Sequence, residues 1–381
     1  MRRASLALPV LGLVVASVPA DAAAPRSLPL GSTVLAEGDC PPETVLQGGR
    51  PPEAEAVWCG TTDRAGRLIP HGPYLGYFRG GQVAERGQFG RGQREGAWVT
   101  WSEDGRMRAS STYRAGVLDG PWEGEGEGGV WLTGAFRKGK RDGMWRMVAR
   151  DGRELGGGAW KAGRRDGMWR ETMDDGTTGE GAYKADLRQG PWRFSWPSGE
   201  PRTSGVFAKG EKTGRWEERD AEGVLRARGR WKGDVRVGVW ESWGSDGRPE
   251  WAGETRDGLR TGPWTEWTQE GERQAGSYAR GLRTGPWTRW HRDGAVASRG
   301  PMVDDRMHGA WEFLDPSGRV VGAGAMVAGE RDGAWVEADT GPDPEVRWTG
   351  RYAAGRRVGR WVATKADGTE IGARDFDVAA P

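Results

Sequence analysis

The triplet Gly-x-Trp recurs along this sequence at a nearly constant interval, and this repetition constrains the fold more than any other feature. Successive triplets are 23 or 24 residues apart, except for the last step, which is 26. Gly72-Pro73-Tyr74 lies 24 residues before the first triplet and is a divergent copy. The triplets begin at Gly96, Gly120, Gly143, Gly167, Gly190, Gly214, Gly238, Gly262, Gly285, Gly309, Gly333 and Gly359. Such a period indicates a repeat architecture in which each unit packs against its neighbours.

Each repeat also contains a turn signal and a second aromatic triplet. Pairs such as Asp104-Gly105, Asp175-Gly176 and Asp246-Gly247 end nine residues after the glycine of Gly-x-Trp. Asp-Gly between apolar segments favours a two-residue type I′ turn, because both central residues need positive φ. The second triplets are Gly87-Gln88-Phe89, Gly134-Ala135-Phe136, Gly158-Ala159-Trp160, Gly205-Val206-Phe207, Gly229-Arg230-Trp231 and Gly350-Arg351-Tyr352. Each repeat is therefore expected to be a β-hairpin.

The spacing of these landmarks predicts how the strands pair. Nine residues separate the glycine of the second triplet from the next Gly-x-Trp, so length varies only in the hairpin arm. If Asp246-Gly247 forms a two-residue loop, Trp240 faces Gly253, and its ring can cover the glycine. The same register pairs Trp145 with Gly158, Trp192 with Gly205, Trp216 with Gly229, Trp287 with Gly300, and Trp311 with Gly324. Repeats one residue shorter, such as the one at Gly167, are expected to carry a local adjustment.

Composition favours a thin β-architecture over a globular core. Glycine accounts for 66 of the 381 residues and tryptophan for 23, whereas glycine averages about 7% of residues in proteins. We therefore predict an all-β fold: an elongated single-layer antiparallel meander of about thirteen 23–24-residue β-hairpin repeats, with about 26 strands. At ~4.8 Å between strands this sheet would be roughly 120 Å long.

The N-terminal residues 1–22 have the pattern of a signal peptide. Arg2 and Arg3 precede an apolar run from Leu6 to Val18, and Ala20-Asp21-Ala22 is a cleavage site. A membrane anchor is the alternative, but a spanning helix needs about 20 apolar residues. We expect export to the periplasm, the outer surface or the medium, with no transmembrane helix in the mature chain.

Two cysteines lie between this segment and the repeats. Residues 23–71 are expected to form an N-terminal cap closed by a disulfide between Cys40 and Cys59, since exported proteins favour disulfides. Two free thiols are the alternative. The repeats then occupy 72–372, and 373–381 form a C-terminal tail.

The combined pattern of Gly-x-Trp, a further aromatic residue, Asp-Gly, Gly-x-aromatic and Lys/Arg-x-Gly resembles the bacterial MORN-repeat variant, including proteins labelled as YwqK-family antitoxins. The resemblance covers residues 72 to about 372. It implies a meander of β-hairpins and a role in protein scaffolding or membrane association. It also implies, as a further alternative, an antitoxin-type partner protein.

The sequence shows no catalytic constellation, and we predict that the protein is not an enzyme. Most carboxylates fall in turns or connectors, where they support and solvate the turn. The three histidines, His71, His291 and His308, are too scattered for a metal cluster. The net charge of +2 gives no reason to expect nucleic acid as a partner. No cofactor or metal is expected.

The connectors carry a regular series of basic residues. They precede the glycine of Gly-x-Trp by two residues and are Arg94, Arg141, Arg165, Arg188, Lys212, Arg236, Arg260, Arg283, Arg331 and Arg357. The windows that end at the hairpin turns, 102–105 through 365–368, are acidic. A basic edge of this kind would suit a repetitive anionic partner such as a lipid headgroup layer. The structural alternative is that each cation stacks on a tryptophan or pairs with a carboxylate.

A second set of tryptophans lies three residues after the repeat tryptophan, on the opposite face of the strand. The set comprises Trp101, Trp243, Trp267 and Trp290, and the last three fall in consecutive repeats. An exposed row of this kind would suit sugar rings or a protein anchor, whereas ordinary packing of the second face is the alternative. The repeat tryptophans themselves are expected to be structural: Trp98, Trp122, Trp145, Trp169, Trp192, Trp216, Trp240, Trp264, Trp287, Trp311, Trp335 and Trp361.

The leading functional prediction is an exported, non-enzymatic scaffold that binds a protein or envelope partner along its length. The alternative is a module that binds a glycan or an anionic lipid surface.

Overall fold

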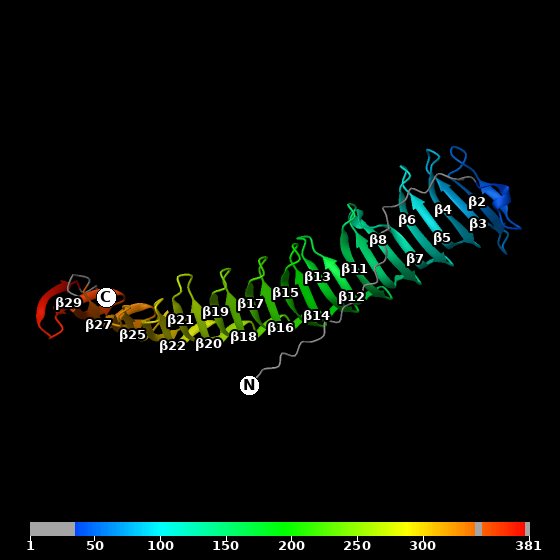
Figure 1. Cartoon of the computed structure of the whole chain (residues 1–381). Helices are drawn as coiled ribbons and strands as arrows, with labels where there is room; N and C mark the ends of the chain where they lie inside the picture. The colour runs from blue at the N-terminus through cyan, green and yellow to red at the C-terminus, as the bar shows by residue number, and fades with distance from the viewer. Residues whose placement is uncertain (1–34, 340–344, 378–381) are drawn as a thin grey trace, which may run out of the picture. The chain divides into compact units, whose positions relative to one another are not determined.

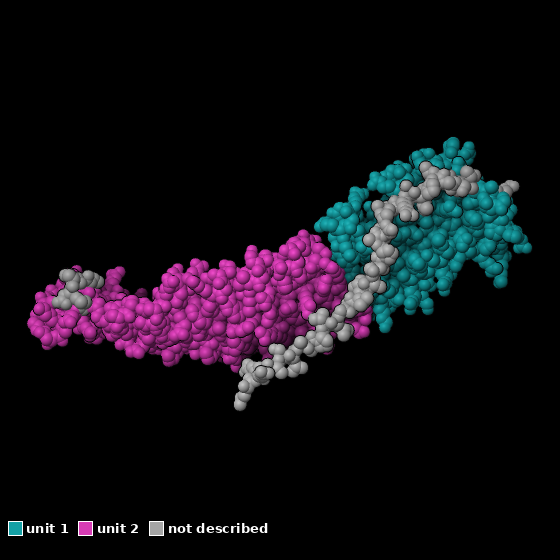
Figure 2. All heavy atoms as spheres, viewed as in Figure 1, with its two compact units in different colours: residues 1–164 teal, residues 165–381 magenta. Residues whose placement is uncertain are grey.

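The computed structural model describes residues 35–339 and 345–377, and the chain is all-β. The described residues form 30 strands in one open antiparallel sheet (Figure 1). The predicted signal peptide, residues 1–22, lies outside the described part of the chain. Residues 1–164 and 165–381 form two compact units (Figure 2).

The first unit contains the cap and the first repeats. Its strands are β1 (Val45–Gly48), β2 (Ala56–Thr62), β3 (Leu68–Tyr77), β4 (Val83–Gly90), β5 (Gln93–Trp101), β6 (Met107–Arg114), β7 (Val117–Glu125), β8 (Trp131–Arg137), β9 (Lys140–Arg141), β10 (Gly143–Val148) and β11 (Glu154–Lys161). Two 3₁₀ turns, η1 (Glu37–Asp39) and η2 (Glu127–Gly129), interrupt the sequence of strands. Strand β3 contains Gly72-Pro73-Tyr74, so the divergent first repeat belongs to the sheet.

The second unit contains the remaining repeats. Its strands are β12 (Arg164–Thr172), β13 (Thr178–Lys184), β14 (Leu187–Ser195), β15 (Pro201–Ala208), β16 (Glu211–Arg219), β17 (Leu225–Lys232), β18 (Val235–Trp243), β19 (Pro249–Arg256), β20 (Leu259–Trp267), β21 (Arg273–Ala279), β22 (Leu282–Trp290), β23 (Val296–Val303), β24 (Arg306–Met307), β25 (Gly309–Leu314), β26 (Val320–Val327), β27 (Glu330–Ala338), β28 (Arg347–Ala353), β29 (Arg356–Thr364) and β30 (Glu370–Phe376). Strand β30 extends through residues 373–376 of the predicted tail.

The strand count agrees with the repeat count. Strands β1 and β2 belong to the cap, and the pairs β9/β10 and β24/β25 are each one repeat strand divided in two. Counting each divided strand once leaves two strands for every repeat. The predicted all-β hairpin meander is confirmed.

The predicted register is also confirmed. The pairs Trp145↔Gly158, Trp192↔Gly205, Trp216↔Gly229, Trp240↔Gly253, Trp287↔Gly300 and Trp311↔Gly324 all face each other across hairpins.

The Asp-Gly turns, in contrast, are not the two-residue type I′ turns predicted. In one repeat the Gly244 N–H donates to the Arg248 carbonyl at 2.8 Å, and the Gly247 N–H donates to the Gly244 carbonyl at 3.0 Å. The loop therefore has three residues, of which only Gly247 is at positive φ (+76°). This is a common hairpin connection with a left-handed glycine. The predicted register survives because a bulge at Glu250 offsets the additional loop residue.

The repeats that are one residue shorter lack this bulge. Their pairing runs without a shift from the tryptophan to the turn, as from Trp169↔Gly181 to Thr172↔Thr178. The adjustment expected in the shorter repeats thus lies in the longer ones, which insert one residue into the second strand.

Type I′ turns occur in the connectors instead. Lys138 and Gly139, for example, have φ of +49° and +76°. The Gly139 N–H donates at 2.7 Å to the carbonyl of Leu118 in the preceding connector. Each connector is therefore a two-residue turn bonded to the one before it, which explains the constant nine-residue spacing.

Ten of the twelve repeat tryptophans cover a glycine of the preceding repeat. At Gly253 the position that a Cβ would take is 2.1 Å from Cδ2 of Trp264. The prediction that a ring covers this glycine is right, but the ring belongs to the next repeat and not to the hairpin partner Trp240. The same relation joins Gly87 to Trp98, Gly134 to Trp145, Gly181 to Trp192, Gly205 to Trp216, Gly229 to Trp240, Gly276 to Trp287, Gly300 to Trp311, Gly324 to Trp335, and Gly350 to Trp361.

The indole N–H finds its partner at the same place. Trp264 Nε1 donates at 2.8 Å to the carbonyl of Glu254, the residue after the covered glycine. The register shifts between Gly253 and Glu254, and Gly262 has φ +60°, so a bulge leaves this carbonyl free to accept the indole. Equivalent bonds are made by Trp98, Trp145, Trp192, Trp216, Trp240, Trp287, Trp311, Trp335 and Trp361.

Two positions show what happens when the glycine is missing. Ser111 stands where the other repeats have a glycine, and Trp122 after it is half-buried, whereas the other eleven repeat tryptophans are buried. Arg374 faces Trp361 in β30, and no strand follows β30 in the described residues. Glycine is therefore present where a following tryptophan needs the space.

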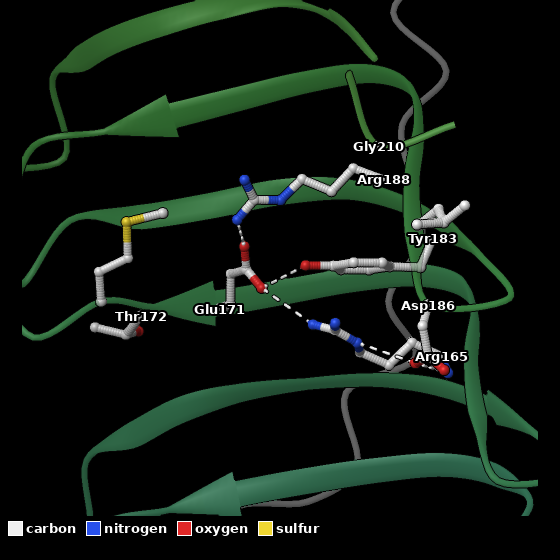
Figure 3. A pocket seen from close by; sticks show the side chains of 9 residues that line it. Arg165, Glu171, Thr172, Tyr183, Asp186, Arg188 and Gly210 are labelled. Carbon is white, nitrogen blue, oxygen red and sulfur yellow. Dashed lines mark hydrogen bonds and ion pairs between the residues drawn. The ribbon is translucent and has the colours of Figure 1, made fainter. Parts of the chain in front are cut away.

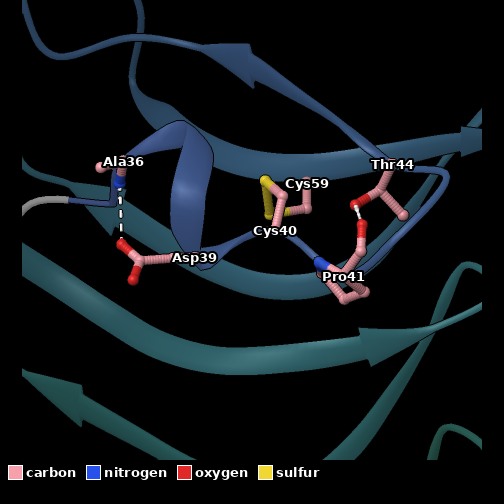
Figure 4. The surroundings of a disulfide bond; sticks show 6 residues. All are labelled: Ala36, Asp39, Cys40, Pro41, Thr44 and Cys59. Carbon is pink, nitrogen blue, oxygen red and sulfur yellow. Dashed lines mark hydrogen bonds between the residues drawn. A yellow bond between two sulfur atoms is a disulfide. The ribbon is translucent and has the colours of Figure 1, made fainter.

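The N-terminal cap is closed as predicted. Cys40 and Cys59 form a disulfide that joins the segment before β1 to the middle of β2, where Cys59 is fully buried (Figure 4). Pro41 and Cys59 pack against Gly72, where a Cβ would lie 2.7 Å and 3.2 Å from their side chains. The cap thus covers the glycine of the first repeat. The disulfide is typical of an oxidising compartment outside the cytoplasm.

Replacing Gly253 with alanine is expected to lower the free energy of unfolding by about 1–3 kcal/mol, because the new Cβ would overlap the Trp264 ring. Gly253 is not at positive φ, so the effect reports packing. Gly372→Ala in β30 is the matched control, because a Cβ there meets no atom within 4 Å. Chemical denaturation followed by tryptophan fluorescence measures both. Equal stability of the two variants would contradict the proposed packing.

Candidate functional site

The basic series predicted as a connector edge lies over the tryptophans. Each cation is placed above the ring of its own repeat, at 4.1 to 5.7 Å from the ring centroid. We call these residues the arginine ladder, and the side of the sheet that bears them the tryptophan face. The ladder comprises Arg94, Arg141, Arg165, Arg188, Lys212, Arg236, Arg260, Arg283, Arg331 and Arg357. This geometry is the stacking that the structural alternative predicted.

Several ladder arginines also meet a carboxylate on the tryptophan face. In the second unit Arg165 and Arg188 approach Glu171 from either side, and the Tyr183 hydroxyl donates to Glu171 Oε2 at 2.9 Å (Figure 3). Asp186 accepts from the backbone N–H of Arg165 at 2.8 Å. A hollow of about 610 Å³ lies among these residues. Both oxygens of Glu171 are engaged, so the carboxylate acts as a counter-ion.

The same cluster recurs in two other repeats of the second unit. Glu337 accepts from Arg331, Arg357 and the Tyr352 hydroxyl, with the last bond 2.8 Å long. Glu266 is bonded in the same way by Arg260 and Tyr278. We call the three groups the Glu–Tyr clusters.

Charge and burial act together on the titration of these clusters. Burial is the largest cause that raises the pKa of Tyr183, and the negative charge of Glu171 adds to it. Burial works against the charged form of Arg188, but hydrogen bonds to Glu171 and Tyr183 outweigh it and raise the pKa of that guanidinium. The phenol thus stays neutral and the guanidinium stays charged.

Sequence analysis missed these clusters. A signal was present: a glutamate two residues after the repeat tryptophan occurs with a tyrosine in the second triplet, as in Glu171 with Tyr183 and Glu266 with Tyr278. Both positions lie on the tryptophan face, in adjacent strands. The pairing was not predicted because each residue is common in turns and strands by itself.

The acidic hairpin turns have the supporting role that the sequence predicted. The Asp246 carboxylate accepts from the backbone N–H of Arg248 at 3.0 Å. Hydrogen bonds from Ser317 and Arg319 lower the pKa of Asp315 to about 2. Asp246 is exposed and Asp315 is half-buried, and both stabilise the turn by accepting its free N–H groups.

The second tryptophan set lies on the opposite side, which we call the outer face. Trp267 pairs with Arg273, and Arg273 pairs with Trp290, so the three side chains form one row across β20, β21 and β22. The Arg273 guanidinium lies 4.0 Å from the centre of the Trp290 ring. Trp243 in β18 is covered by Arg228 at 5.1 Å. Trp243, Trp267 and Trp290 are all half-buried.

The outer face beside this row is uncharged. Every second residue of β20, β21 and β22 points outward, and apart from Arg273 none of them carries a charge. These residues are Leu259, Thr261, Pro263, Thr265 and Trp267 in β20, Ala275, Ser277 and Ala279 in β21, and Leu282, Thr284, Pro286, Thr288 and Trp290 in β22. Leu259 and Leu282 are exposed. We call this surface the tryptophan patch.

Trp101 is separate from the patch. It occupies the same repeat position in β5 of the first unit, where it is half-buried, but the adjacent repeats have Tyr77 and Glu125 there. The structure thus brings Trp267 and Trp290 into one row and leaves Trp101 by itself.

The described residues contain no group of three His, Cys, Asp or Glu side chains placed to hold a metal ion. Within the same residues, no helix has the length and apolar character needed to cross a membrane.

Comparison with known proteins gives no family assignment. No protein-family model matches the sequence, and no curated protein matches it.

The hydroxyl of Tyr74 is expected to titrate late. Burial, with the negative charge of Glu85, raises the pKa of Tyr74 from 10.0 to about 12. Because the unfolded chain loses this proton at the lower pH, stability is expected to fall as the pH rises from about 10 to 12. Alkaline titration of tyrosinate absorbance in wild type and Tyr74→Phe measures the difference. Tyr183 and Tyr278 also have raised pKa values and contribute to the late absorbance, so the variant should lose only part of it. An unchanged late absorbance in Tyr74→Phe would contradict the prediction.

Replacing Glu337 with glutamine is expected to lower the free energy of unfolding by about 1–3 kcal/mol, because two arginines then lose their common counter-ion. The Glu337 side chain is only 10% exposed. Glu312→Gln is the control, since its pair with Arg299 is 31% exposed on the glutamate side and should contribute less than about 1 kcal/mol. Urea denaturation compares them; a smaller loss for Glu337→Gln than for Glu312→Gln would refute the argument.

Proposed function

We propose that this chain is an exported, non-enzymatic scaffold of MORN-like repeats that binds a protein partner on its tryptophan patch. The signal-like segment 1–22 and the Cys40–Cys59 disulfide support export. The repeat pattern supports the MORN-like assignment. A non-enzymatic role is supported by carboxylates that are held in turns, in the Glu–Tyr clusters or in ion pairs with arginine.

The observation that carries the proposal is the row formed by Trp267, Arg273 and Trp290. Protein interfaces are enriched in tryptophan and arginine, and their centres are depleted of other charged residues. The patch has this composition: the row borders an outward surface of Thr, Ser, Ala and Pro side chains. Half-buried rings held by neighbours also lose little side-chain entropy on binding.

A protein partner is favoured over a glycan by the way the rings are covered. Sugar rings stack on an open aromatic face, but Arg273 lies 4.0 Å over Trp290 and Arg228 lies 5.1 Å over Trp243. Trp290 and Trp243 therefore present their edges and the guanidinium groups to a partner. The arginine ladder supports an anionic lipid surface less well, because its cations are stacked on rings and many are paired with carboxylates.

The test is capture from the native envelope fraction by the immobilised full chain, at low and at high salt. The double variant Trp267→Ala/Trp290→Ala removes the row. Trp101→Ala is the matched control, because it deletes the same repeat position outside the patch. We expect wild type and Trp101→Ala to retain one common polypeptide at high salt, and the double variant to lose it.

Other outcomes identify the alternatives. Retention of cell-wall polymer that the double variant loses would replace the protein partner with a glycan. Salt-sensitive binding to anionic vesicles that is unchanged in the double variant would indicate that the arginine ladder binds an anionic lipid surface. Equal retention of the polypeptide by all three proteins would exclude the patch. A toxin among the retained polypeptides would support the antitoxin alternative.

A further inference from the structure

An unusual cross-strand pair lies on the outer face of the second unit, two hairpins before the tryptophan patch. Arg215 in β16 faces Arg230 in β17. Both side chains are exposed. Like charges directly opposite each other in a sheet destabilise the pairing.

No other repeat has this arrangement at the equivalent positions. Among the described residues, the other pairs at these positions contain no charged residue, one charged residue or two residues of opposite charge. Examples are Pro286↔Pro301, Ala334↔Arg351 and Arg360↔Asp375. The repeat therefore retains a repulsive contact that a single substitution would remove.

The surrounding carboxylates neutralise at most one member of the pair. Arg228, the next outward residue of β17, is bonded to Glu241. Arg215 forms one ion pair, with 3.3 Å between its Nη2 and Oε1 of Glu217. Arg230 has no ion pair within the described part of the chain, and Lys232 continues the basic outward series of β17.

The three guanidinium groups also border a hollow. It has a volume of about 610 Å³ and is lined by Arg215, Arg228, Gly229, Arg230, Val239 and Glu241. Gly229 contributes only its backbone to the hollow, because a side chain at this position would point to the tryptophan face, where the ring of Trp240 lies.

We propose that this hollow binds an oxyanion, a phosphate, sulfate or carboxylate group, between Arg215 and Arg230. Guanidinium groups bind oxyanions through paired, charge-assisted hydrogen bonds. An anion between the two arginines converts their repulsion into two attractions. The site is independent of the tryptophan patch and does not require that the patch bind a protein.

The test measures binding of inorganic phosphate to the full chain by calorimetry and by the shift of the thermal midpoint, with chloride at matched ionic strength as the reference. Wild type is expected to bind and to be stabilised. Arg230→Gln is expected to weaken phosphate binding about tenfold or more, the effect of losing a charged hydrogen-bond donor.

Arg351→Gln is the matched control. Arg351 occupies the same repeat position and is exposed, but it faces Ala334. The Arg351→Gln variant should bind phosphate as wild type does. Arg230→Gln should also be at least as stable as wild type without the anion, because the repulsion is gone, so its loss of binding would not reflect unfolding.

Further arms separate the sources of the anion. Acetate and sulfate in place of phosphate show whether a carboxylate or a tetrahedral group is preferred, and binding of either supports the site. No binding of any of the three by wild type would overturn the proposal. An equal loss in Arg351→Gln and Arg230→Gln would overturn it as well, because the effect would then be general surface charge.

Discussion

The placement of one indole over one glycine is the contact on which the rest of this structure depends. A tryptophan ring needs a large apolar contact surface and an acceptor for its N–H group. The glycine of the preceding repeat leaves room for the ring, and the bulge at Gly-x-Trp frees the next carbonyl, as in Gly253, Glu254 and Trp264. A cation of the arginine ladder stacks on the ring, as Arg260 does on Trp264. A single layer of strands thereby acquires a buried core without a second layer of structure.

Spacing in the sequence predicted the fold class and the strand register, because side chains alternate strictly along a strand and the triplets repeat with a fixed step. It did not predict which tryptophan covers Gly253, since spacing says nothing of the direction in which a ring tilts. The turn type at Asp246-Gly247 was wrong for a related reason. A three-residue loop with a bulge and a two-residue loop without one give the same pairing at Trp240, so the register alone could not distinguish them.

The candidate site was predictable only in part, because its groups come from different strands. The recurrence of an outward tryptophan at Trp243, Trp267 and Trp290 follows from the repeat period. Arg273 enters the row from the intervening strand, and its role depends on the short, bulge-free turn of that repeat. The Glu–Tyr clusters and the Arg215–Arg230 pair likewise require the cross-strand register. The tryptophan face thus carries the structural groups, and the outer face carries the differences between repeats.

The coupling between repeats has a direction, and this direction bears on how such a chain evolves. Most units supply the ring, the indole donor and the connector bond that complete the unit before them. A duplicated unit inserted in register therefore brings what its predecessor needs and presents to its successor the same glycine and carbonyl. Recombination between repeats can lengthen or shorten the array without creating a defective junction. Copy number is then free to drift, while the outer face of each copy diverges under separate selection.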